Sequence, residues 1–152
     1  MIYPYLTYCV EVWGNAGQTR LESVLKLQKK VIRIIASAGY YAKSDPLFHK
    51  LDILKITDIY KLSVASFLFK FVKGKLPSIF NDIFIRSSDI ATRVTRNKNK
   101  LALPLCRTDL YKKSIKYQGP FIWNMYEGVI DNKCSFHAFK KRLRQYIKCK
   151  ST

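Results

Sequence analysis

Residues 19–38 read TRLESVLKLQKKVIRIIASA and carry the clearest helical pattern in the chain. Apolar side chains recur there at i, i+3 and i+4, which places them on one face of an α-helix. Thr19 is expected to cap the start of this helix and Gly39 to end it. The apolar stripe consists of Leu21, Val24, Leu25, Val31, Ile32 and Ile35, and the opposite side carries Lys26, Lys29, Lys30 and Arg33.

Similar patterns predict helices further along the chain. A short helix is expected from Ser44 through Leu51, and a longer one opens at Thr57 and ends at Gly74. The longer helix should bury a single apolar stripe, formed by Ile59, Tyr60, Val64, Phe67, Leu68 and Phe71.

Two more helices are expected in the C-terminal third. Residues 114–126 have helical spacing, and Pro120 is expected to set the true start of that helix. Ser135 is expected to cap a final helix. Its inner side would carry Phe136, Phe139, Leu143 and either Tyr146 or Ile147, and its outer side Lys140, Lys141, Arg142 and Arg144.

Two stretches have a weaker pattern. Residues 1–13 contain tyrosines and valines that favour a strand, but the spacing of Leu6, Val10 and Trp13 favours a short helix. Residues 101–106 are extended and can pair with residues 107–111, with Pro104 at an edge position. The sequence therefore predicts a mainly α fold: a small helical bundle with a basic loop and at most a short β-hairpin near residues 101–111.

Positive charge is concentrated late in the chain. The 152 residues contain 28 Lys and Arg against 10 Asp and Glu, a formal net charge of +18. Residues 86–116 hold nine basic and two acidic side chains, and residues 132–152 hold seven basic and no acidic ones. We expect a helical part over 1–85, a basic loop or linker over 86–100 and a basic C-terminal extension over 101–152.

A charge excess of this size on a folded body is usually tied to an anionic partner. Hydrophobic residues make up 48% of the chain, too many for a disordered basic tail. Nucleic acid is the leading partner, and an acidic membrane surface is the alternative. Four cysteines without a Cys-x-x-Cys pair, and no secretory signal, predict a reducing intracellular compartment, in either nucleus or cytoplasm.

The residues needed for catalysis are scarce. The two histidines are His49 and His137, and no Asp-Asp or Asp-x-Asp pair could hold two magnesium ions. His137 could share a zinc ion with cysteines at 106, 134 and 149, but the spacing matches no common zinc site and free thiols are the simpler interpretation. We expect neither catalysis nor a metal or cofactor.

Residues 107–124 place basic side chains beside aromatic rings. Such rings either fill a core or stack on bases. Trp123 is expected in the core, because it lies on the apolar flank of a helix. Tyr111 and Tyr117 lie next to lysines, and for them both roles stay open.

Three stretches in this order, the second and third each followed by a further segment, resemble one family. The first is residues 2–15 (IYPYLTYCVEVWGN), and the second is 27–35 (LQKKVIRII) followed by 45–55 (DPLFHKLDILK). The third contains Arg107-Thr108, Tyr117-Gln-Gly-Pro and Trp123-Asn124 and is followed by Phe139-Lys-Lys-Arg-Leu143. Together they resemble the C-terminal part of reverse transcriptases from non-LTR retrotransposons of the jockey-like group. After Asn124 the chain departs from the family, which tends to continue Ser-Leu-Pro.

The resemblance implies a helical thumb that grips the template–primer duplex, followed by a C-terminal extension. The family's catalytic aspartates lie in a Tyr/Phe-Ala-Asp-Asp motif that this sequence lacks. The chain would be a non-catalytic fragment of an RNA-directed DNA polymerase of a mobile element, with RNA or an RNA–DNA duplex and the rest of the reverse transcriptase as partners. The alternative is a decayed remnant with no evolved activity.

The expected contact residues share a basic or aromatic side chain on a predicted outer surface. They are Lys29, Lys30, Arg33, Arg93, Arg96, Lys98, Lys100, Arg107, Lys112, Lys113, Lys116, Tyr117, Lys140, Lys141, Arg142 and Arg144. They should contact backbone phosphates, which position a nucleic acid without specifying its sequence.

Overall fold

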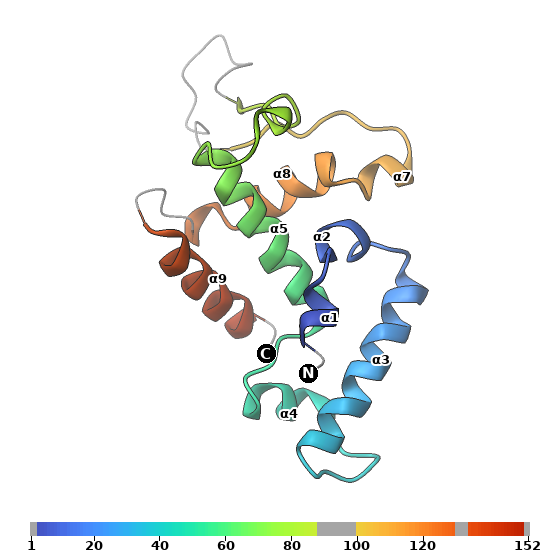
Figure 1. Cartoon of the computed structure of the whole chain (residues 1–152). Coiled ribbons are helices and arrows are strands. Elements are labelled where there is room, and N and C mark those ends of the chain that lie inside the picture. Colours follow the sequence, from blue (N-terminus) through green and yellow to red (C-terminus); the bar gives the residue numbers. More distant parts are fainter. Residues whose placement is uncertain (1–2, 88–99, 130–133, 151–152) are drawn as a thin grey trace.

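Helix α5 (Ile56–Val72) lies at the centre of the fold and contacts α1, α2, α3, α8 and α9. The computed structural model describes residues 3–87, 100–129 and 134–150, and in it α3 and α9 lie on either side of α5 (Figure 1). The other elements are α1 (Tyr3–Thr7), α2 (Val10–Trp13), α3 (Gln18–Ile35), α4 (Ser44–Lys50), η1 (Ser78–Phe80), α7 (Asp109–Lys112), α8 (Ile115–Met125), η2 (Glu127–Val129) and α9 (Phe136–Lys150). The predicted mainly α fold is confirmed.

Burial of α5 extends well beyond the single predicted stripe. Ten of its residues are buried, among them Leu62, Ala65 and Phe69, which lie outside that stripe. A helix that is apolar on all sides is stable only when other elements cover all sides. The surrounding helices do this for α5, so it is the central helix of the bundle rather than a surface helix.

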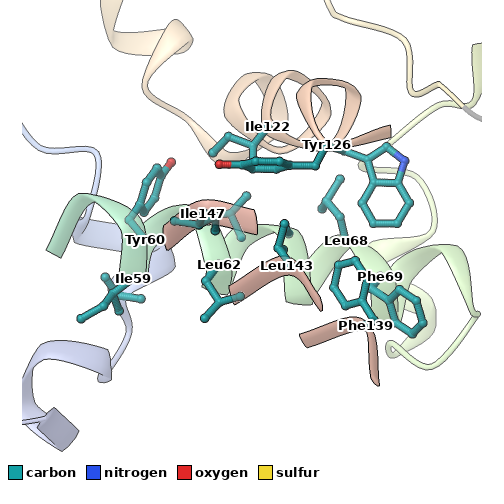
Figure 2. Packing of buried hydrophobic residues seen from close by; sticks show 14 of the residues in the cluster. Ile59, Tyr60, Leu62, Leu68, Phe69, Ile122, Tyr126, Phe139, Leu143 and Ile147 are labelled. Carbon is teal, nitrogen blue, oxygen red and sulfur yellow. The ribbon is translucent and has the colours of Figure 1, made fainter. Parts of the chain in front are cut away.

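One core joins the parts of the chain before and after residues 88–99. The rings of Phe69 on α5 and Phe139 on α9 stack with centroids 4.4 Å apart (Figure 2). Ile122 and Tyr126 pack over α5 from the α8 side (Figure 2). Burial raises the pKa of Tyr126 to about 12, with smaller contributions from Asp58 and Tyr146. The predicted division of roles among 1–85, 86–100 and 101–152 stays a prediction.

Helix α8 runs through Pro120, so the prediction that Pro120 sets its start is wrong. The helix instead follows Ser114 and tolerates the missing N–H of Pro120 in its interior. The neighbouring Gly119 has a packing role, because a Cβ there would lie 2.9 Å from Cε1 of Phe84. Gly119 therefore permits close packing of α8 on the core.

The ends of α3 differ from those predicted. The helix starts at Gln18 after Gly17, so Thr19 lies inside it and does not cap it. It stops before Gly39, because Ser37 adopts a left-handed φ of 50° and the Ala38 N–H donates to the Arg33 carbonyl at 2.9 Å. This arrangement is a Schellman motif. At the end of α5, Gly74 takes the left-handed position with φ of 63°, as predicted.

No hairpin forms within residues 101–111. Leu101 instead makes an antiparallel bridge with Arg86, and the Asn124 side chain binds both the N–H and the carbonyl of Leu101 at 3.0 and 2.9 Å. Residues Asp109–Lys112 are helical, with the Thr108 hydroxyl accepting from the Tyr111 N–H. The hairpin needed residues 107–111 as an extended second strand, but most of them form α7 instead. The short N-terminal helix is confirmed, in two pieces separated at Cys9 (φ 48°).

Candidate nucleic-acid interface

Three buried side chains fix the orientation of α9. Phe139, Leu143 and Ile147 recur every four residues and are each at most 2% exposed. Ser135 caps the helix as predicted, because its Oγ accepts from the Ala138 N–H at 3.3 Å. Of the two predicted alternatives for the inner side, Ile147 is the buried one. This anchoring leaves three successive basic side chains on the exposed surface: Lys140, Lys141 and Arg142.

The two later cations of α9 serve the fold instead. Arg144 Nη2 donates to the Asp52 backbone carbonyl at 2.8 Å and to its carboxylate at 3.2 Å. Lys148 Nζ also pairs with the Asp52 carboxylate. Asp52 follows α4 and has a left-handed φ of 56°. These contacts tie α9 to the turn between α4 and α5, so Arg144 is a less available phosphate ligand than the sequence suggested.

The end of α5 brings two further lysines to α9. Lys70 Nζ lies 5.2 Å from the ring centroid of Phe136, at the start of α9. Lys73 Nζ lies 5.7 Å from the ring centroid of Phe69, which itself packs on Phe136 and Phe139. Lysine ammonium groups are held over aromatic faces by the ring quadrupole. We call Lys70, Lys73, Lys140 and Lys141 the α5–α9 basic surface.

Sequence reasoning missed Lys70 and Lys73. Both lie in the N-terminal half, which has the lower charge density, whereas most of the expected contact residues lie in the C-terminal half. Their spacing of three residues just before Gly74 was the available signal, because it puts both on the last turn of a helix.

A second basic group surrounds the junction of α7 and α8. Lys112, Lys113 and Lys116 are exposed there, and Lys112 pairs with Asp109 at 3.4 Å. The Asn15 side chain donates to the Lys113 carbonyl at 3.1 Å and so joins this junction to the turn before α3. Arg107 is exposed just before α7.

The aromatic rings of residues 107–124 divide between core and surface. Trp123 is 2% exposed, so its predicted place in the core is confirmed. Tyr117 is half-buried and stacks on Phe121 with centroids 6.4 Å apart. Tyr111 is 37% exposed. Stacking of either tyrosine on a base stays a prediction.

Helix α3, which carries Lys29, Lys30 and Arg33, lies across α5 from α9 (Figure 1). Arg33 Nε donates to the Ala42 carbonyl at 2.8 Å, so this guanidinium closes the turn after α3. The pKa of Asp45 is lowered mainly by its hydrogen bond with Lys55. The positive charge of Lys29 lowers the pKa of Asp45 further. Lys30 is exposed. The structure therefore does not join Lys29, Lys30 and Arg33 to the α5–α9 basic surface.

The remaining predicted contacts are partly outside the described residues. Lys100 pairs with Glu127 at 3.5 Å. Arg93, Arg96 and Lys98 fall within residues 88–99, for which the structure gives no placement.

Neither a metal cluster nor a membrane span is found within the described ranges. No group of three or more His, Cys, Asp or Glu side chains is placed to hold a metal ion among residues 3–87, 100–129 and 134–150. Within the same ranges, no helix combines the length and the apolar character that crossing a bilayer requires.

Comparison with known proteins gives no match, whether against family models, curated proteins or solved structures. The resemblance to non-LTR reverse transcriptases therefore stays a prediction.

Proposed function

We propose that this chain binds the phosphate backbone of RNA or of an RNA–DNA duplex through the α5–α9 basic surface, as a non-catalytic module of a retrotransposon reverse transcriptase. The observation that carries the proposal is the anchoring of α9. Phe139, Leu143 and Ile147 hold its inner side in the core, which fixes Lys140 and Lys141 on the outer side.

The charges around this surface favour an anionic partner. Lys140 and Lys141 have no ion pair with any acidic group in the part of the chain that the structure describes. Lys70 is held near Lys140, because both line one groove beside α9. Like charges kept close together repel one another, and a phosphate backbone relieves that repulsion while releasing its counterions.

Rigidity also supports a binding role. The lysines project from two packed helices rather than from a loop, and the stacked rings of Phe69 and Phe139 join those helices. Cations held on packed helices can contact backbone phosphates, and such contacts position a nucleic acid without reading its bases.

Charge reversal on α9 tests the proposal. Lys140→Glu with Lys141→Glu should weaken binding of a fluorescent RNA–DNA duplex by about tenfold or more at ~0.1 M salt, where distant charges are largely screened. The matched control is Lys29→Glu with Lys30→Glu on α3, which makes the same charge change across α5 and should cost less than about threefold. Equal losses in the two variants would show that net charge alone drives binding.

A further inference from the structure

We infer that the groove between α1, α5 and α9 binds one unpaired nucleotide of a single strand, with its phosphate at Lys70 and Lys140. This inference rests on the proposed function and assigns part of the same surface to a particular kind of ligand. The groove has a volume of about 320 Å³. That is at the small end of the range for ligand pockets, which suits a single nucleotide.

The groove has a cationic end and an anionic end. Lys70 of α5 and Lys140 of α9 line one end, and Glu11 of α2 lines the other. Lys70 and Ser63 are two helical turns apart on α5, about 10 Å along the axis. Ser63 marks the anionic end because its hydroxyl donates to the Glu11 carboxylate. A ligand that fits must therefore be anionic at one end and rich in hydrogen-bond donors at the other.

The hydroxyl groups that line the groove present acceptor oxygens. Thr7 donates to the carbonyls of the preceding turn of α1, Ser63 donates to Glu11, and Ser66 donates to the Leu62 carbonyl at 2.6 Å. Each hydroxyl has one proton, so only lone pairs remain available in the groove. These lone pairs complement N–H and O–H groups of a ligand.

A nucleotide has both an anionic end and hydrogen-bond donors. Its phosphate suits the lysine end, and the ribose hydroxyls and an exocyclic amine supply donors for the acceptor oxygens and Glu11. Adenine and cytosine carry that amine, whereas uracil does not. The ring of Tyr3, which also lines the groove, provides apolar surface for the base.

The base in this groove must be unpaired. In a duplex the exocyclic amines are already paired, and the stacked bases cannot enter a groove of this size. The outer lysines would then follow the backbone of the same strand, while the groove takes one base from it.

An NMR titration of the full chain with AMP tests the inference directly. AMP should shift the amide signals of Ser63 and Ser66 together with those of Lys70 and Lys140, and UMP should shift the two serines less. Inorganic phosphate alone should move only the lysine end. The inference is overturned if AMP leaves Ser63 and Ser66 unchanged, or if inorganic phosphate reproduces the whole pattern.

A groove-filling variant separates this inference from the proposed function. Ser63→Phe should weaken binding of a short oligoadenylate by about fivefold, the lower end of the contribution of one stacked base, and leave duplex binding within about twofold. The matched control is Ser23→Phe on the exposed side of α3, which should change neither. The melting temperature and the retained duplex binding report whether Ser63→Phe is folded.

The combined outcomes are distinct. If Ser63→Phe leaves oligoadenylate binding intact while reversal of Lys140 and Lys141 weakens it, the groove inference fails and the proposed function stands. If reversal of those lysines changes no nucleic-acid affinity, the proposed function fails, whatever AMP does in the groove.

Discussion

Helices α3 and α9 share an amphipathic sequence pattern but differ in how much of the helix other elements cover. Each has an apolar stripe and a basic opposite side. In α9 the stripe is covered, with Phe139, Leu143 and Ile147 all buried. In α3 the buried residues are Gln28 and, from the stripe, Ile32, while Ile35 of the stripe is 55% exposed. Leu27 and Ile34, which lie outside the stripe, are 61% and 77% exposed.

The difference shows that amphipathic spacing does not determine how much of a helix is covered. The inner row of α9 fits against α5 and α8, so its orientation is fixed by apolar packing. The attachment of α3 relies more on a polar contact: the Gln28 side chain donates to the Leu54 carbonyl at 2.8 Å and accepts from the Ile56 N–H at 3.0 Å. Of these two helices, α9 therefore presents its lysines from the more firmly anchored one.

Truncation of the inner row of α9 should have the largest effect on stability. Leu143→Ala should lower the free energy of unfolding by about 3 kcal/mol, because a fully buried leucine leaves a cavity when it is shortened. Ile34→Ala on α3 is the matched control and should change it by less than about 0.5 kcal/mol. Urea denaturation measures both, and similar losses at the two sites would remove the contrast between the helices.

Removal of the Gln28 side chain should have the next largest effect. Gln28→Ala leaves the Leu54 carbonyl and the Ile56 N–H without their partner, which should cost about 2 kcal/mol. The control is Leu27→Ala at the neighbouring exposed residue, which should hardly change the free energy of unfolding in the same denaturation experiment. A neutral result for Gln28→Ala would mean that α3 is held mainly by its apolar contacts.

The smallest expected effect is a change in the pKa of Asp45, which lies near Lys29 of α3 and Lys55. The pKa of Asp45 lies below its ordinary value of 3.8, chiefly because of Lys55 and less because of Lys29. This pair therefore stabilises the fold above pH 3.8, and the contribution is lost as pH falls through the lowered folded pKa. Lys55→Met should raise the pKa of Asp45 more than Lys29→Met does, as followed by NMR titration. Lys141→Met should leave it unchanged.

Much of the fold could be predicted from sequence because it depends on local patterns. The spacing of Phe139 and Leu143 predicted the buried side of α9, with Tyr146 or Ile147 as its last member, and Gly74 predicted the end of α5. The missed features depend on contacts between distant residues. The close packing of Gly119 on Phe84 and the paired hydrogen bonds of Gln28 have no local sequence pattern.

The candidate site could be predicted only in part, for the same reason. The α9 lysines follow from the helical pattern, but the meeting of α9 with the end of α5 follows from the aromatic packing of Phe69, Phe136 and Phe139. Likewise, Arg144 has the same charge as Lys141, and only its distance to Asp52 shows that it binds within the fold. Counting charge along the chain could not distinguish these two cations.

The salt dependence of binding is the most direct test of the proposed interface. The logarithm of the affinity for an RNA–DNA duplex should fall linearly with the logarithm of salt concentration, with a slope set by the number of phosphates contacted. Lys140→Gln with Lys141→Gln should reduce the magnitude of that slope by about 2, because each lysine that contacts a phosphate contributes about 1. Lys29→Gln with Lys30→Gln should leave it unchanged. An unchanged slope for the α9 variant, or an equal reduction for the α3 variant, would contradict binding through the α5–α9 basic surface.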